Sequence, residues 1–148
     1  MLERLIFVDC KANGPCPGMG DLTEFGAVAY NSRRAYHGII GLTNESRVEV
    51  FTDFEKWLIE NVHGRPIMVS DTRHTTFSGS TTVSGQRSAR SPFGHSASRI
   101  SDFYAGLVGH FSRTQEWKRL RITPPDHNPV HDALGNVEAF ERLPNGER

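Results

Sequence analysis

The sequence predicts an α/β fold built on a mixed sheet, in which a three-strand antiparallel meander is joined through a helix to a parallel strand, with helices on both faces. Three observations predict it: three apolar segments follow one another within the first 41 residues, an amphipathic segment comes next, and a fourth apolar segment follows that one. The 148 residues suit one compact domain, which can bury a core without a metal or a disulfide. We therefore expect a single domain over residues 1–148.

The first three strands are predicted from their apolar runs and short connections. Residues 4–10 are almost continuously apolar, which is typical of a central strand buried on both faces. A segment rich in Gly and Pro follows, and residues 23–30 and 34–41 then predict two further strands. Because the links are short, we expect an antiparallel meander.

The crossover to the parallel strand is predicted as a helix over residues 53–62. Thr52 can accept a hydrogen bond as its N-cap, and Gly64 is placed to end it. Residues 66–70 form the fourth strand, and a strand reached through a helical crossover runs parallel to the first. The apolar face of this helix is expected to comprise Phe54, Trp57, Leu58 and Val62.

The segment after the fourth strand has no apolar period. Between residues 70 and 91, 11 of 22 residues are Ser or Thr, which predicts an irregular loop over 72–90. Order is expected again in a helix over 97–111, a short helix or strand over 116–122, and a last helix over 130–143. The expected apolar face of the 97–111 helix consists of Ile100, Phe103, Tyr104 and Leu107, and that of the last helix of Leu134, Val137, Ala139 and Phe140.

Composition excludes several classes of protein. Lys plus Arg and Asp plus Glu each total 17, so there is no global positive field to attract nucleic acid. The basic residues between 113 and 121 are either a solvated helix face or a local basic surface. The two cysteines, Cys10 and Cys16, have no second pair and do not form a zinc pattern. No segment has the length and apolarity of a membrane span, and no signal peptide is evident, so we expect a cytoplasmic protein.

Two polar motifs stand out from this background. Asp9 ends the first apolar run, a place where an acidic residue, a spacer and a second acidic residue commonly hold a divalent metal. Here Lys11 occupies the second acidic place, and its ammonium is expected to pair with Asp9. Near the other end, His131 is followed five residues later by Asn136, where a carboxylate would complete the pattern.

Three segments together resemble a known family. They are F-V-D-C-K-A-N-G with T-E-F-G-A-V-A-Y, then I-M-V-S-D, then H-N-P-V-H-D-A-L-G-N-V-E-A-F. The chain resembles the DEDDh 3′–5′ exonuclease superfamily, which includes the proofreading exonuclease, RNase T and oligoribonuclease. The resemblance implies a ribonuclease H-like fold that acts on single-stranded DNA or RNA 3′ ends. It also implies two Mg²⁺ or Mn²⁺ ions on four carboxylates, which activate a water, and a histidine as general base.

Carried onto this sequence, the resemblance retains two positions of the site. Asp9 matches the first carboxylate and His131 the general base. The other three carboxylate places fall on Lys11, Thr76 and Asn136.

Asp71 and Asp132 are nearby acids that could substitute as metal ligands, but Asp132 should point about 100° away from His131 on a helix. Substrate contacts are expected from Lys11, Asn13 and Gly14. We expect an impaired or inactive exonuclease or, alternatively, a non-catalytic relative that binds nucleic-acid ends or a protein, with a homodimer as its expected assembly.

The Ser/Thr-rich segment has a possible origin in the gene. A choice of codons compatible with residues 72–85, read after one base is restored behind Asp71, can spell N-P-A-Y-D-F-Q-W-I-N-D-G-F-W. That reading puts an aspartate at position 76 and aromatic residues after it, as the family's helix requires. Lys11 and Asn136 are each one base change from Glu and Asp. The hypothesis is a frameshifted copy of an active exonuclease, and the nucleotide sequence of the gene tests it.

Overall fold

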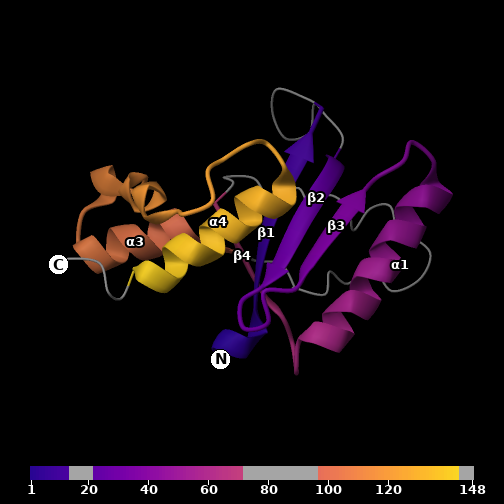
Figure 1. Cartoon of the computed structure of the whole chain (residues 1–148), viewed down its shortest axis with the longest axis horizontal. Helices are drawn as coiled ribbons and strands as arrows, with labels where there is room; N and C mark the ends of the chain where they lie inside the picture. The colour runs from indigo at the N-terminus through magenta and orange to yellow at the C-terminus, as the bar shows by residue number, and fades with distance from the viewer. Residues whose placement is uncertain (14–21, 72–96, 144–148) are drawn as a thin grey trace.

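The computed structural model describes residues 1–13, 22–71 and 97–143 (Figure 1). It contains one five-stranded mixed sheet in the order β3-β2-β1-β4-β5. β1 pairs antiparallel with β2 and parallel with β4, β2 pairs antiparallel with β3, and β4 pairs parallel with β5. The predicted meander, the central first strand and the parallel fourth strand are confirmed. The strands are β1 Leu5–Ala12, β2 Leu22–Ala29, β3 Ala35–Ile39, β4 Ile67–Ser70 and β5 Ser98–Arg99.

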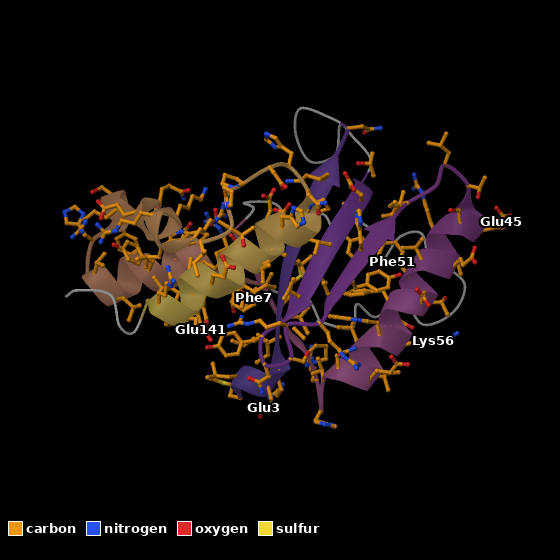
Figure 2. All side chains as sticks on the ribbon, viewed as in Figure 1. Glu3, Phe7, Glu45, Phe51, Lys56 and Glu141 are labelled. Carbon is orange, nitrogen blue, oxygen red and sulfur yellow. The ribbon has the colours of Figure 1, made fainter. Side chains whose placement is uncertain are left out.

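β1 divides the core into two layers because successive side chains of a strand point to opposite faces. Phe7 is fully buried on the face that α3 and α4 cover, and Ile6 and Val8 are fully buried on the face that α1 covers. Figure 2 shows Phe7 on the α4 side of the sheet and Phe51 on the α1 side. The prediction of helices on both faces is therefore confirmed. The helices are α1 Asn44–Asn61, α3 Ile100–Val108 and α4 Pro129–Arg142, with 3-10 turns η1 Leu2–Arg4, η3 Phe111–Arg113 and η4 Glu116–Leu120.

The predicted start of α1 is wrong by nine residues. The N-cap is Thr43, whose hydroxyl accepts a hydrogen bond from the Ser46 amide at 3.2 Å, and not Thr52. The first half of the helix is anchored by Phe51, whose ring stacks on Phe25 with centroids 5.9 Å apart. The sequence prediction placed the start of the helix where the apolar period is strongest, and it therefore left Phe51 out. The expected buried face is confirmed for Phe54, Leu58 and Val62, with Trp57 partly buried.

α3 is shorter than the predicted 97–111 helix. Residues 98–99 pair with β4 as the unpredicted strand β5, and Gly109 ends the helix with a φ of 69°. Ile100 and Tyr104 are buried, but Phe103 and Leu107 are 48% and 45% exposed, so half of the expected apolar face is wrong. The short element over 116–122 is the 3-10 turn η4, and the last helix is confirmed as α4.

Three sequence expectations lie outside the described residues: the irregular loop over 72–90, and the roles of Gly14 and Thr76. Within the described ranges, none of the helices combines the length and the apolarity needed to cross a membrane.

Candidate functional site

The site lies where the N-terminal end of α4 crosses β1 and β2. Asp9 pairs with Gly26 across these strands. A Cβ atom at Gly26 would lie 2.3 Å from both the carbonyl carbon of Pro129 and the amide nitrogen of Val130, which is far inside van der Waals contact. The missing side chain at Gly26 therefore lets the helix backbone rest directly on β2, beside Asp9.

The first turn of α4 is fixed by its cap. The Asn128 side-chain oxygen accepts hydrogen bonds from the amides of Val130 and His131, at 3.0 and 3.4 Å, and Pro129 takes the first helical position. This orientation turns Asp132 into the protein and leaves the His131 side chain half exposed. The predicted divergence of these two neighbours on the helix agrees with their different surroundings.

Removing this cap is expected to weaken α4. Asn128→Ala leaves the first-turn amides without their acceptor and should lower the free energy of unfolding by about 1 kcal/mol. Urea unfolding followed by circular dichroism measures it. Asn128→Asp is the matched control, since it keeps an acceptor and should stay close to wild type. An alanine variant as stable as the aspartate variant would show that the cap is unimportant.

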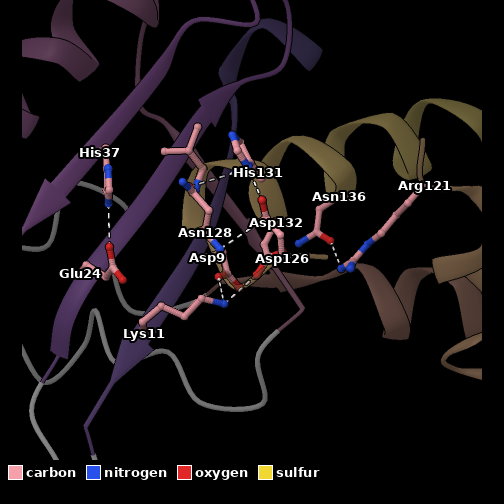
Figure 3. A network of polar contacts seen from close by, with 11 residues as sticks. Asp9, Lys11, Glu24, His37, Arg121, Asp126, Asn128, His131, Asp132 and Asn136 are labelled. Carbon is pink, nitrogen blue, oxygen red and sulfur yellow. Dashed lines mark hydrogen bonds and ion pairs between the residues drawn. The ribbon is translucent and has the colours of Figure 1, made fainter. Parts of the chain in front are cut away.

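Lys11 bridges the strand and the helix (Figure 3). Its Nζ lies 2.8 Å from Asp9 Oδ2 and 2.7 Å from Asp132 Oδ2. Lys11 and Asp9 are two apart on β1, so their side chains leave the same face of the strand. The two carboxylate side chains are only 14% and 10% exposed, and that of Lys11 is 27% exposed. The expected pairing of Lys11 with Asp9 is confirmed, and Asp132 is a second partner for the ammonium.

Burial and pairing compete at this ion network. Burial raises the pKa of Asp9 above its usual value, even though the hydrogen bond and the charge of Lys11 act to lower it. Burial alone would lower the pKa of Lys11, but hydrogen bonds to Asp132 and Asp9 outweigh this effect and the pKa is raised. Hydrogen bonds therefore hold Lys11 as an ammonium, while burial opposes the negative charge on Asp9.

The raised pKa of Asp9 predicts how the substitution Asp9→Asn changes the stability of the fold. A raised carboxyl pKa stabilises the fold below the unfolded value and loses that contribution as the pH rises through the folded value. At pH 7, Asp9→Asn should therefore be at least as stable as wild type, or less stable by no more than about 0.5 kcal/mol. Urea titrations of both proteins at pH 4 and pH 7 measure this. A clear loss of stability at pH 7 would mean that the ion pair outweighs burial.

His131 belongs to a separate contact. His131 Nδ1 lies 2.6 Å from Asp126 Oδ2, and this hydrogen bond lowers the pKa of the Asp126 carboxyl. Both side chains are about half exposed. Such a carboxylate orients an imidazole and leaves its other nitrogen for a second partner.

Asn136 is held by a different cation. It is buried in α4, and its side-chain oxygen accepts a hydrogen bond from the Arg121 guanidinium, which also lies 5.1 Å above the Trp117 ring. The charge of Arg121 acts to lower the pKa of Asp9, so Arg121 belongs to the electrostatic surroundings of the ion network. Two protein cations thus lie around Asp9.

Asp71 has partners of its own at the end of β4. Its carboxylate accepts a hydrogen bond from the Ser101 hydroxyl and pairs with Lys118 at 3.0 Å. Ser101 is fully buried and also accepts from the Trp117 indole at 3.1 Å. These contacts tie β4 to α3 and η4. Asn13 is exposed just beyond β1.

Sequence reasoning missed three residues that shape the site. Gly26 carried a signal, because a glycine inside a strand often marks a close backbone approach. Asp126, five residues before His131, carried only a turn signal in P-P-D-H-N-P. Arg121 belongs to the basic residues between 113 and 121, and nothing in the sequence indicates its contact with Asn136.

The donors around Asp9 do not fit the two divalent ions that the resemblance implies. Among the residues that the structure describes, no group of three or more His, Cys, Asp or Glu side chains could hold a metal ion. Asp9 and Asp132 both contact the Lys11 ammonium, which repels a cation. The ligand that the resemblance places at Thr76 lies outside the described ranges.

No family model matches the chain, and no curated protein matches it.

Proposed function

We propose that this chain is a 3′–5′ exonuclease-type protein whose hydrolytic centre is disabled, and that it binds single-stranded DNA or RNA ends without cutting them. The observation that carries the proposal is the position of Lys11. Its ammonium contacts both Asp9 and Asp132, at the place where the family would use carboxylates to bind divalent cations.

The architecture supports the ancestry in this proposal. An antiparallel meander, a helical crossover to parallel strands, and a C-terminal helix across the central strand are the features of a ribonuclease H-like domain. The two retained family positions, Asp9 on β1 and His131 on α4, lie on the elements that such a domain uses for its site. Fold alone does not establish an activity, so the proposal rests on the site.

Electrostatics supports the loss of hydrolysis. Two divalent ions repel each other and need several negative ligands to hold them close together. Here Asp9 and Asp132 are already neutralised in part by Lys11, and the neutral Asn136 is bonded to Arg121. Charge stabilisation supplies most of the catalysis at such centres, and losing one contributor alone commonly lowers the rate by about 10²–10³.

End binding survives the loss of the carboxylates better than hydrolysis does. Binding a single strand depends on phosphate contacts and base stacking, which require no metal. The proposed binding is weak and salt-dependent, because the net charge is zero and Lys11 is already paired with two carboxylates.

A protein partner, including a second copy of the chain, is the second candidate. Phe103, Leu107 and Phe111 on α3 and η3 are 48%, 45% and 88% exposed. Exposed large apolar side chains near one another favour an interaction with protein. Sedimentation velocity over a range of concentrations distinguishes a homodimer from a monomer.

Equilibrium binding in EDTA tests the proposed function. Fluorescence anisotropy with labelled single-stranded DNA and RNA should show binding that weakens as salt rises, and a blunt duplex of the same sequence should bind more weakly. Binding that requires Mn²⁺ would contradict a metal-independent site. No binding to either single strand at low salt would contradict the proposed function and leave the protein-partner candidate.

A further inference from the structure

The contacts of Lys11 have the form of cation coordination. One nitrogen lies within 3 Å of a carboxylate oxygen from β1 and of another from α4. Hard divalent cations in proteins take carboxylate oxygens as ligands in the same way, at slightly shorter distances of about 2.0–2.6 Å. The ammonium therefore has the place between the two carboxylates that a single divalent cation would take.

The two carboxylates need a cation. Asp132 is buried, and its Oδ1 has no hydrogen-bond partner among the described residues, although its Oδ2 accepts from Lys11. Asp9 and Asp132 both contact the same ammonium nitrogen, so two like charges lie close together. Without a positive charge between them, β1 and α4 would bring two like charges together in a poorly solvated place.

We infer that Lys11 is a built-in substitute for a divalent cation, and that Asp9 and Asp132 form a latent site for one oxygen-preferring divalent ion, such as Mn²⁺, which opens when Lys11 is removed. The fold of the natural chain is accordingly independent of metal. This inference rests on the ion network alone and does not require that the chain bind nucleic acid.

The test compares Lys11→Met with wild type, with Mn²⁺ or EDTA present. Methionine keeps much of the side-chain volume and removes the charge. A site with two carboxylates should have a dissociation constant on the order of 1 mM, so about 10 mM Mn²⁺ should raise the Tm of the variant by about 3–6 °C. The Tm of wild type should not change. Electron paramagnetic resonance of free Mn²⁺ measures binding directly, at about one ion per variant chain.

Lys118→Met is the matched control, because it removes the same group from a single carboxylate, Asp71. It should show no Mn²⁺ response. The double variant Lys11→Met, Asp132→Asn removes one of the like charges together with the ammonium, and should fold without binding Mn²⁺. A folded double variant would show that the fold tolerates methionine at position 11.

Three results would overturn the inference. The first is Mn²⁺ binding by wild type that is lost in Asp9→Asn, since the carboxylates would then accept a metal despite Lys11. The second is a folded Lys11→Met variant that does not respond to Mn²⁺. The third is a variant that stays unfolded in Mn²⁺ while the double variant folds, since the cation would then fail to replace the ammonium.

Discussion

Gly26→Ala is expected to lower the free energy of unfolding by about 3 kcal/mol, because the new methyl group would collide with the backbone of α4. The nearest atoms, in Pro129 and Val130, are 2.3 Å from the added Cβ, and they belong to a helix and not to a flexible side chain. Either α4 shifts away from β2 or the strand distorts. Urea unfolding measures the loss.

The matched control is Gly106→Ala in α3. A Cβ there meets nothing within 4 Å, and alanine is the better helix former, so this variant should be as stable as wild type or more stable by up to about 1 kcal/mol. The Gly26 variant should also weaken the contact of Lys11 with Asp132, because that contact depends on where α4 lies. Equal stability of the two alanine variants would contradict the close approach of α4 to β2.

Lys11→Met is expected to lower the free energy of unfolding by about 2–4 kcal/mol in EDTA at pH 7. Removing one partner of a buried ion pair commonly costs about 3–5 kcal/mol, and we reduce this range because the Lys11 side chain is 27% exposed. Two carboxylates lose their shared counter-charge in this variant. Lys118→Met breaks a single pair with Asp71, in which the Lys118 side chain is 43% exposed, and should cost about 1 kcal/mol.

The difference in unfolding free energy between wild type and Lys11→Met depends on pH, because the pKa of Lys11 is raised. A lysine whose pKa is raised on folding contributes stability below its unfolded value, which is near 10.5, and loses it as the pH rises through the folded value. The gap between wild type and Lys11→Met should therefore be full at pH 7 and shrink above about pH 10.5. A gap that is unchanged at high pH would assign the loss to packing and not to charge.

The central sheet and the last helix could be predicted because their apolar patterns are strong. β1 is nearly continuous in apolar residues, and α4 follows a helical period with a proline at its start. The start of α1 was missed because Thr52 and Thr43 offer the same capping group, and packing of Phe51 on Phe25 favours the longer helix. β5 has two residues, too few to leave a periodic signal.

The site was predictable in part. Residues two apart on a strand share a face, so the pairing of Lys11 with Asp9 followed from β1 alone. Which residue of α4 meets them depends on the position and rotation of the helix on the sheet. Gly26 and the Asn128 cap set these, and they turn Asp132 toward Lys11 while His131 turns toward Asp126. A sequence motif alone does not specify how α4 is rotated on the sheet.

We propose that the carboxylate centre of this chain does not hydrolyse nucleic acid, and 3′-end shortening of 5′-labelled single-stranded DNA and RNA in Mn²⁺ tests this proposal most directly. Wild type and Asp9→Ala should both leave the substrate at full length. The Lys11→Glu, Thr76→Asp, Asn136→Asp variant restores the carboxylates that the resemblance implies, and it should be the form that shortens the strand. Shortening by wild type from the 3′ end, dependent on Mn²⁺ and abolished by Asp9→Ala, would contradict the account.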